Sequence, residues 1–344
     1  MPIRVLVVDD SAFSRKVIRE CLNESGDIEV VGIARSGLEA LEKIAELSPD
    51  VVTLDLVMPD LDGVGVLRAL AADTGGRLAP RVVAVSVSGA NSELGVEALQ
   101  NGAVDLVQKP TALANDRLYE LRTDLVSKVR AAAVARPSRV RIDALSAPEP
   151  IATAPSHGIQ AVVIGSSTGG PQALSRLLAA IPADFALPLA IALHIPAEYT
   201  EAMARRFDKS CAIDVVEAHD GVQMRPGLAI LARGGSHLRL QRDTDRVIAR
   251  VEGFPVMPFY PSVDILFRSA ADAYSGNVLG VVLTGMGSDG LEGSRAIRGA
   301  GGRVVTESES SAIVYGMPQS VHAAGLANAE APLDSMLSEI LRQL

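Results

Sequence analysis

The sequence predicts two α/β domains joined by a linker, and three observations support this. Short apolar runs alternate with amphipathic segments over residues 1–120, and the alternation resumes at residue 159. Such alternation is typical of parallel sheets covered by helices. The length of 344 residues suits about two domains. The segment between them is rich in alanine, proline and serine. We therefore expect domains at residues 1–125 and 159–344, with a linker over 126–158.

The first domain is expected to be doubly wound around a five-stranded parallel sheet. Its apolar runs occupy residues 5–8, 30–33, 51–54, 82–85 and 104–107. Amphipathic segments such as 14–23 and 38–47 have the spacing of helices that cover the sheet.

The linker is expected to begin as the tail of a helix and then to become semi-extended. Four prolines exclude a long helix there; they are Pro137, Pro148, Pro150 and Pro155. Arginines such as Arg130 are scattered through it. These basic residues could dock on an acidic surface, but we expect a solvated tether.

The second domain is expected to be α/β with a mostly parallel sheet. Its apolar runs occupy residues 161–164, 189–193, 213–216, 228–231, 278–283 and 303–305. Residues 238–251 could form a hairpin. Aromatic residues make up 3% of the chain and tryptophan is absent, so the cores must be aliphatic.

Composition excludes several classes of protein. A net charge of −9 argues against binding to nucleic acid, which normally requires a basic face. Two cysteines far apart in the sequence, Cys21 and Cys211, are no disulfide framework and fit a reducing compartment. The apolar stretches at 3–8 and 186–193 are too short for a signal peptide or a membrane span. We expect a soluble cytoplasmic protein without membrane insertion.

Acidic residues follow two strands of the first domain. Asp9 and Asp10 end the first strand and Asp55 ends the third, so the three carboxylates should converge at the carboxyl edge of the sheet. Their mutual repulsion favours a bound hard cation such as Mg²⁺. Ser86 and Lys109, at the ends of the fourth and fifth strands, should face the same crevice. A lysine and a hydroxyl beside a metal-bound carboxylate suit phosphoryl transfer onto Asp55.

These residues resemble the receiver domain of two-component response regulators over about residues 1–125. The motifs that carry the resemblance are Val-Val-Asp-Asp-Ser at 7–11, Leu-Asp-Leu-Val-Met-Pro-Asp-Leu-Asp-Gly at 54–63, Val-Ser at 85–86 and Lys-Pro at 109–110. The resemblance implies Asp55 as the phosphoacceptor, a histidine kinase as the phosphodonor, and Asp9, Asp10 and Asp55 around magnesium. It also implies Ser86 as the switching hydroxyl and Lys109 as the ammonium that senses phosphate. Leu106 stands where receivers tend to carry an aromatic ring.

A glycine-rich turn follows the first strand of the second domain. Gly165-x-Ser167-x-Gly169 lies between that strand and a helix expected to start near Pro171. The turn could expose a serine nucleophile, cradle a phosphate or cap the helix. The phosphate interpretation is weak, because Ser167 replaces a glycine of the dinucleotide fingerprint and the lysine of a P-loop is missing.

A serine nucleophile needs a base and an acid that orients the base. His194 ends the strand 189–193 and should project from the same sheet edge as Ser167. Asp289 lies on a glycine-rich turn after the strand 278–283, from which it could reach the histidine. His219 and His237 also follow predicted strands and remain alternatives, whereas His157 and His322 are expected at the surface. The order Ser, His, Asp differs from that of the α/β-hydrolases but permits a triad.

The second domain resembles the catalytic domain of the chemotaxis protein-glutamate methylesterases. The motifs that carry the resemblance are Ile-Gly-Ser-Ser-Thr-Gly-Gly-Pro at 164–171, His-Ile-Pro at 194–196, Pro-Ser-Val-Asp at 261–264 and Leu-Thr-Gly-Met-Gly-Ser-Asp-Gly at 283–290. The resemblance implies Ser167 as nucleophile, His194 as base and Asp289 as its orienter. Backbone N–H groups near Thr168 and Met286 could bind the oxyanion.

The resemblance implies phosphorylation-regulated hydrolysis of glutamyl methyl esters on chemoreceptors, and often deamidation of glutamines, with the unphosphorylated receiver as inhibitor. Methylated chemoreceptors would be the substrate, and the esterase reaction would need no cofactor. Residues 256–260 are apolar where polar and basic residues are expected, and Leu193 stands where glutamine is frequent. These departures keep open a receiver-controlled hydrolase of another ester or amide outside chemotaxis. A binding module with an inactive site is a third interpretation, and the intact serine, histidine and aspartate argue against it.

Overall fold

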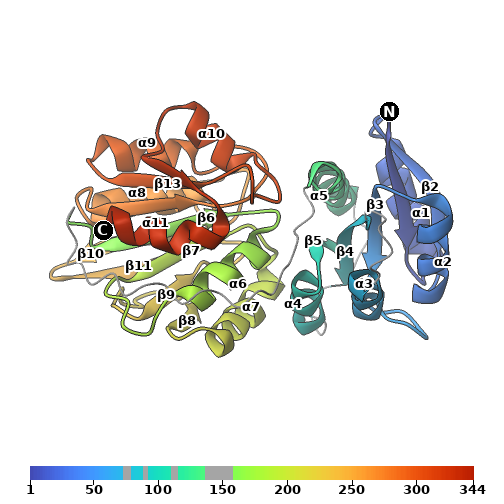
Figure 1. The fold of residues 1–344 in the computed structure, drawn as a ribbon, viewed down its shortest axis with the longest axis horizontal. Helices are drawn as coiled ribbons and strands as arrows, with labels where there is room; N and C mark the ends of the chain where they lie inside the picture. The colour runs from blue at the N-terminus through green and yellow to red at the C-terminus, as the bar shows by residue number, and fades with distance from the viewer. Residues whose placement is uncertain (73–78, 88–91, 110–114, 136–157) are drawn as a thin grey trace. The chain divides into compact units, whose positions relative to one another are not determined.

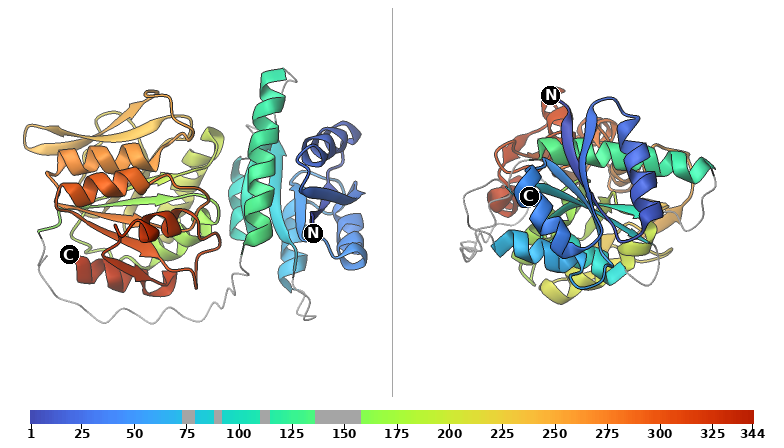
Figure 2. Two further views of the ribbon diagram at one scale, coloured as in Figure 1. Left: turned by 90° about the horizontal axis from the view of Figure 1, so that it is seen from above. Right: turned by 90° about the vertical axis from the view of Figure 1, so that its right-hand side faces the viewer.

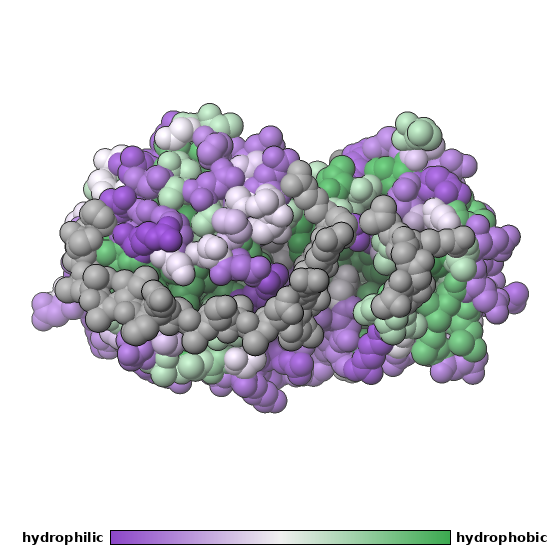
Figure 3. Space-filling model, viewed as in Figure 1, coloured by the Kyte–Doolittle hydropathy of each residue, from purple (hydrophilic) through white to green (hydrophobic). Residues whose placement is uncertain are grey.

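The computed structural model describes residues 1–72, 79–87, 92–109, 115–135 and 158–344, and at 87 and 115–120 it describes the backbone alone. Two compact units are formed, Met1–Pro137 and Ser138–Leu344, and each is described by itself (Figure 1). Within the described ranges, none of the helices combines the length and the apolar character that crossing a membrane requires. Polar side chains cover much of the viewed face of each unit (Figure 3).

The N-terminal unit is the predicted doubly wound domain. In its described part, five parallel strands follow the order β2-β1-β3-β4-β5. The strands are β1 (Ile3–Val8), β2 (Ile28–Ala34), β3 (Val51–Asp55), β4 (Arg81–Val87) and β5 (Ala103–Lys109). The helices are α1 (Ala12–Asn23), α2 (Gly37–Leu47), α3 (Gly63–Ala72), α4 (Ser92–Gln100) and α5 (Asn115–Val134). Helix α1 packs against α5 on one face, while α2, α3 and α4 pack in series on the other (Figure 2).

Because helices cover both faces of the sheet, side chains on both faces of each strand are buried, and the strands are continuous apolar runs in the sequence. In β1, Val5, Leu6 and Val7 are fully buried, although their side chains alternate between the two faces of the sheet.

Helix α5 extends into the segment expected to begin as the tail of a helix. It continues to Val134, so residues 126–134 of the expected linker are helical. Val129 and Ala132 are fully buried because this part of α5 packs on the sheet. Arg130, expected on a solvated tether, forms a two-point ion pair with Asp27, with Nε and Nη2 at 2.8 and 2.7 Å from its carboxylate oxygens. The rest of the expected linker, residues 136–157, lies outside the described residues.

The C-terminal unit contains a seven-stranded sheet in the order β14-β13-β12-β6-β7-β9-β8. Every strand pair of this sheet within the described residues is parallel. Its strands are β6 (Ala161–Ser166), β7 (Leu189–Leu193), β8 (Asp214–Glu217), β9 (Leu228–Leu231), β12 (Val278–Val282), β13 (Arg303–Glu307) and β14 (Ala329–Ala331). The sequence analysis missed β14, which at three residues is too short to show a period.

Helices cover both faces of this sheet (Figures 1 and 2). They are α6 (Gly170–Ala180), α7 (Ala197–Ser210), α8 (Val263–Ala273), α9 (Leu291–Gly299), α10 (Met317–Ala323) and α11 (Met336–Gln343). The expected hairpin forms from β10 (His237–Asp243) and β11 (Arg246–Glu252), which pair antiparallel. Its buried residues, among them Leu240 and Val247, share a core cluster with Phe267 of α8.

Both sheets reverse their winding direction beside their first strand. In the C-terminal sheet, β6 lies between β7 and β12. The loops that follow these three strands therefore meet at one edge, which is where α/β sheets bind ligands. In the N-terminal sheet, β1 lies between β2 and β3 in the same way.

Candidate active site

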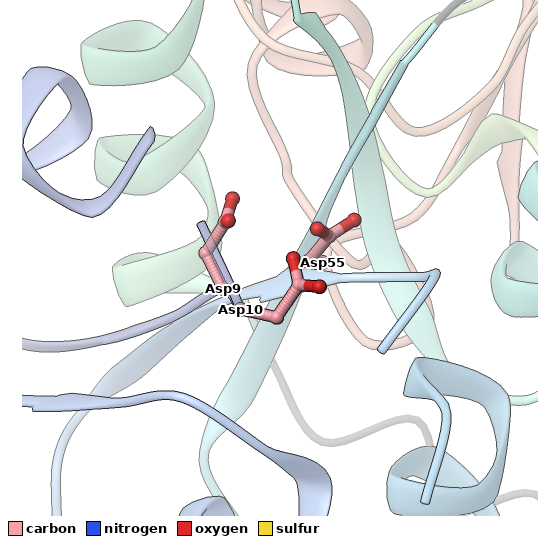
Figure 4. A group of neighbouring side chains, drawn as sticks. All are labelled: Asp9, Asp10 and Asp55. Carbon is pink, nitrogen blue, oxygen red and sulfur yellow. The ribbon is translucent and has the colours of Figure 1, made fainter. Parts of the chain in front are cut away.

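The acidic cluster of the N-terminal domain forms as predicted. Asp9, Asp10 and Asp55 offer carboxylate oxygens that all lie within 4.8 Å of one another (Figure 4). Asp9 and Asp55 are buried, whereas Asp10 is exposed. Three carboxylates so close together repel one another strongly, and oxygen ligands of this kind suit Mg²⁺. The donor set therefore fits a magnesium ion.

Lys109 partly compensates this charge. Its Nζ lies 2.6 Å from Asp9 Oδ2 and 2.7 Å from Asp55 Oδ2. Burial raises the pKa of Asp55 above its ordinary value, and Lys109 opposes that rise. Ser86 is fully buried on β4, the strand between those of Asp55 and Lys109. Leu106 is also fully buried, in β5.

The turn after β6 presents Ser167 at the sheet edge. Ser167 is half-buried, and its N–H donates to the Thr284 carbonyl at 3.0 Å. Gly169 has a φ of +78°, and a Cβ there would lie 2.7 Å from the side chain of Ile313, so this position requires glycine. Gly169 is also the N-cap of α6, which has no side-chain capping bond. The interpretation of Ser167 as a helix cap is therefore wrong.

His194 lies directly beside this turn. Ser166 and Leu193 are register partners in β6 and β7, and the His194 N–H donates to the Ser166 carbonyl at 3.1 Å. His194 Nε2 lies 2.9 Å from Asp289 Oδ2. His194 Nδ1 is buried and has no hydrogen-bond partner among the described residues.

The other candidate histidines lie elsewhere. His219 is exposed, and His322 pairs with Glu330 at the surface. His237 is fully buried on the hairpin. His157 lies outside the described residues. Within the described chain, the histidine that pairs with Asp289 is therefore the predicted one.

The Asp289 carboxylate is held on every side by donors. Oδ1 accepts the Ser262 hydroxyl and the Asp264 N–H, both at 3.0 Å, and Oδ2 accepts the Val263 N–H at 2.7 Å. Burial alone would disfavour the charged form. The bonds from His194 and the backbone outweigh burial and lower the pKa of Asp289 below its ordinary value.

The motif at 261–264 thus has a role that the sequence analysis did not assign. It supplies the donors that surround Asp289, and its own Asp264 Oδ1 accepts the N–H groups of Gly290 and Gly293 at 2.9 and 2.7 Å. The start of α8 and the loop after β12 are thereby joined by two carboxylates, Asp289 and Asp264.

A further buried acid near the site lies on β13 and was not predicted from the sequence. Glu307 is fully buried and accepts the Thr284 N–H at 2.8 Å. Burial raises its pKa. Because the Thr284 carbonyl also accepts the Ser166 hydroxyl at 2.7 Å, Glu307 supports the loop that contacts the serine turn. An apolar strand that ends in a lone glutamate is the only sequence signal for it.

The residues expected to supply oxyanion donors belong to two segments, the serine turn and the loop after β12. Thr168 is buried on the serine turn and Met286 is 36% exposed on the loop after β12. That loop comes close to the nucleophile candidate, since a Cβ on Gly285 would lie 2.9 Å from the Ser167 Cβ.

His237 anchors a loop beside the site, residues 253–262. Its Nε2 lies 2.9 Å from the Pro255 carbonyl and its Nδ1 accepts the Ser262 N–H at 3.1 Å. The Tyr260 ring stacks on it at a centroid distance of 4.5 Å. Since Nδ1 accepts a hydrogen bond, the bound form of His237 is the neutral Nε2–H tautomer.

The neutral form of His237 in the folded chain predicts that stability depends on pH. Burial lowers the pKa of His237, and the Pro255 carbonyl, Asp289 and Glu252 oppose this while Arg239 adds to it. A histidine with a lowered folded-state pKa binds more protons when unfolded, so stability falls as pH drops below the unfolded value of about 6.5.

We expect His237→Gln to remove this dependence. Between pH 7.5 and 5.5 the free energy of unfolding should fall in both proteins. The decrease should be larger in the parent chain than in the variant by up to about 1 kcal/mol. Urea unfolding at both pH values measures the difference, and parallel losses in the two proteins would contradict the assignment.

The first domain is doubly wound and holds a carboxylate cluster beside a lysine. The second is an α/β domain that gathers a serine, a histidine and an aspartate. Together they define a response regulator with an enzymatic output domain. Residues 5–120 match the family model described as response regulator receiver domain. Residues 162–340 match the model described as CheB methylesterase. The chain belongs to the CheB methylesterase family and is an ester hydrolase with a receiver domain.

Full-length relatives support this assignment. A protein-glutamate methylesterase/protein-glutamine glutaminase of Myxococcus xanthus is 58% identical over 100% of this chain and 98% of its own length. One from Symbiobacterium thermophilum is 41% identical over 99% of this chain and 97% of its own length. The crystal structure of the Thermotoga maritima CheB methylesterase catalytic domain is 33% identical, covering 54% of this chain and 99% of that one at a TM-score of 0.53.

Proposed function

We propose that the chain hydrolyses glutamyl methyl esters on chemoreceptors, and deamidates glutamines there, by a Ser167-His194-Asp289 mechanism under control of the receiver. The observation that carries the proposal is the His194–Asp289 pair, at 2.9 Å and almost fully buried, with His194 at the end of the strand next to the Ser167 turn. The names of the full-length relatives support the choice of substrate.

The pair determines which nitrogen acts as base. An ionised carboxylate only accepts hydrogen bonds, so Asp289 holds the proton of His194 on Nε2. Nδ1 is then the nitrogen with a free lone pair. Ser167 Oγ attacks the ester carbonyl carbon while its proton passes to Nδ1, and Asp289 stabilises the imidazolium that forms.

The remaining steps reuse the same groups. The tetrahedral intermediate carries its negative charge on the former carbonyl oxygen, and we assign the backbone N–H groups of Thr168 and Met286 to bind it. Its collapse breaks the C–O bond, and His194 returns the proton to the departing methoxide, giving methanol. Water then attacks the acyl-enzyme with His194 as base and releases the glutamate side chain. With glutamine as substrate, ammonia departs in place of methanol.

Regulation is assigned to Asp55. Asp9, Asp10 and Asp55 would hold Mg²⁺, which when bound neutralises the phosphoryl oxygens during transfer from a histidine kinase. Lys109 would pair with the phosphoryl group on Asp55, and Ser86 would donate to one of its oxygens. Phosphate added there shifts the equilibrium of a two-state receiver away from its inhibitory state.

The substrate is tested by incubating the purified chain with methylated receptor fragments and measuring methanol. We expect methanol release that increases when a small-molecule phosphodonor and Mg²⁺ are added. Hydrolysis of a generic ester without any methanol from receptor fragments would favour a hydrolase of a different signalling pathway. The apolar residues 256–260 motivate that alternative.

The control mechanism makes its own prediction. Asp55→Asn should abolish stimulation by the phosphodonor, and deletion of residues 1–140 should raise basal activity on the order of tenfold. Asp62→Asn, a change of an aspartate in the loop that follows β3, is the matched control and should retain stimulation. An isolated catalytic domain no faster than the unphosphorylated full chain would contradict inhibition by the receiver.

A further inference from the structure

One aromatic ring beside the active site is not explained by core packing. The Phe259 ring is 40% exposed, so it contributes little to burial in the core. It stacks on the imidazole of His194, with ring centroids 4.5 Å apart and planes 9° from parallel. This places an apolar ring flat against one face of the histidine proposed as the base.

The ring sits on a fixed support. Residue 259 belongs to the loop 253–262, which His237 holds at Pro255 and Ser262. The Tyr260 carbonyl also accepts the Gly235 N–H at 3.3 Å. Phe259 is therefore presented by an anchored segment, and its contact with His194 does not depend on a free loop.

Asp289 and Phe259 constrain the His194 ring in different ways. The hydrogen bond to Asp289 holds one edge of the imidazole at Nε2, but a single in-plane bond leaves the ring free to tilt about that edge. A parallel aromatic ring at van der Waals distance opposes the tilt. Both contacts together determine where Nδ1 points. The face of an aromatic ring also attracts a cation, so the stack favours the imidazolium that forms during the reaction.

We propose that Phe259 is a positioning residue that holds the His194 imidazole plane, so that Nδ1 is directed at the Ser167 hydroxyl. The proposal rests on the function assigned to Ser167 and His194 above. It also gives a role to the apolar segment 256–260: its aromatic side chain at 259 organises the base, in addition to any contact with substrate.

The test compares three variants of the full-length chain. Phe259→Leu keeps an apolar side chain but removes the flat ring, and Phe259→Tyr keeps the ring. Phe254→Leu is the matched control, because Phe254 is an exposed phenylalanine of the same loop, at 76% exposure. We expect Phe259→Leu to lower kcat by about tenfold on both methylated receptor fragments and a small generic ester, with KM changed less than about twofold. Phe259→Tyr should retain most of the rate, and Phe254→Leu should match the parent chain.

Other kinetic patterns would overturn the proposal. A rise in KM on receptor fragments alone, with kcat retained, would make Phe259 a substrate-docking residue. Equal losses in Phe259→Leu and Phe254→Leu would make the effect one of loop structure.

A second readout does not depend on turnover. Nitrogen NMR of the histidine rings, with the His194 signals identified from their loss in His194→Gln, should show the Nε2–H tautomer in both proteins. The His194 signals should be sharp in the parent chain and broadened by exchange in Phe259→Leu, because the ring can then tilt. Identical spectra in the two proteins would overturn the positioning role. A chain with the expected spectra but no ester hydrolysis would instead refute the proposed function.

Discussion

Replacing Ser167 with alanine is expected to reduce methanol release by about 10⁴-fold or more, because removing the nucleophile of a serine hydrolase leaves only binding and oxyanion stabilisation. Ser167 is half-buried on a turn, and its side chain caps no helix. The stability of the folded chain should therefore change by less than about 0.5 kcal/mol. Methanol release under substrate saturation and urea unfolding measure the two effects.

The adjacent serine provides a matched control. Ser166 is fully buried, and its hydroxyl donates to the Thr284 carbonyl at 2.7 Å. Ser166→Ala should cost about 1 kcal/mol of stability through the lost hydrogen bond. It should retain most of the activity, because this hydroxyl is not accessible to a substrate. The opposite pattern, with Ser166→Ala inactive and Ser167→Ala active, would transfer the nucleophile role to Ser166.

The second large effect is expected at Asp289. Asp289→Asn should lower kcat by about 10³- to 10⁴-fold, because an amide cannot hold the Nε2 proton of His194 as a carboxylate does. The histidine can then present the wrong tautomer to Ser167, and its imidazolium loses the compensating charge.

Asp289→Asn should also be less stable than the parent chain by about 1–3 kcal/mol. The neighbours of Asp289 are all donors: Ser262 Oγ, the N–H groups of Val263 and Asp264, and His194. The amide nitrogen of asparagine would face one of these donors and leave it unpaired.

Two controls separate the chemistry from general loss of charge. Asp272→Asn removes an exposed carboxylate on α8 and should leave the rate unchanged. The double variant Ser167→Ala with Asp289→Asn should be little slower than Ser167→Ala alone, because residues that act as a unit are not additive. A double variant that is slower by the product of both effects would show that Asp289 acts independently of the serine.

Much of the fold could be predicted from local pattern. Buried parallel strands are continuous apolar runs, so all eleven expected strands of the two sheets could be recognised from runs such as 51–54 and 278–283 alone. Errors occurred where local pattern is weak. Strand β14 is three residues long. The helix tail at the start of the expected linker was predicted, but its end at Val134 depends on packing against the sheet, a tertiary effect that composition does not reveal.

The candidate site divides in the same way. Ser167, His194 and Asp289 could be proposed from sequence because each follows a strand, and strand ends of a parallel sheet share one edge. The supporting residues could not. Glu307 and His237 act on backbone groups of loops distant in sequence, and no spacing rule relates them to the site. The same holds for Phe259, whose contact with His194 depends on how an irregular loop is anchored.

The sequence by itself predicted the two α/β domains, the carboxylate cluster around Asp55 and the candidate serine, histidines and aspartate of the second domain. These features follow from short-range periodicity and from the residue types at strand ends, and both can be recognised within short segments of the sequence. Only the tertiary structure decided that the Ser167 side chain is not a helix cap, that His194 rather than His237 pairs with Asp289, and that Phe259 lies flat on the base. The physical reason is that hydrogen bonds and ring contacts act over a few ångströms, so they depend on how loops far apart in sequence pack at the common sheet edge.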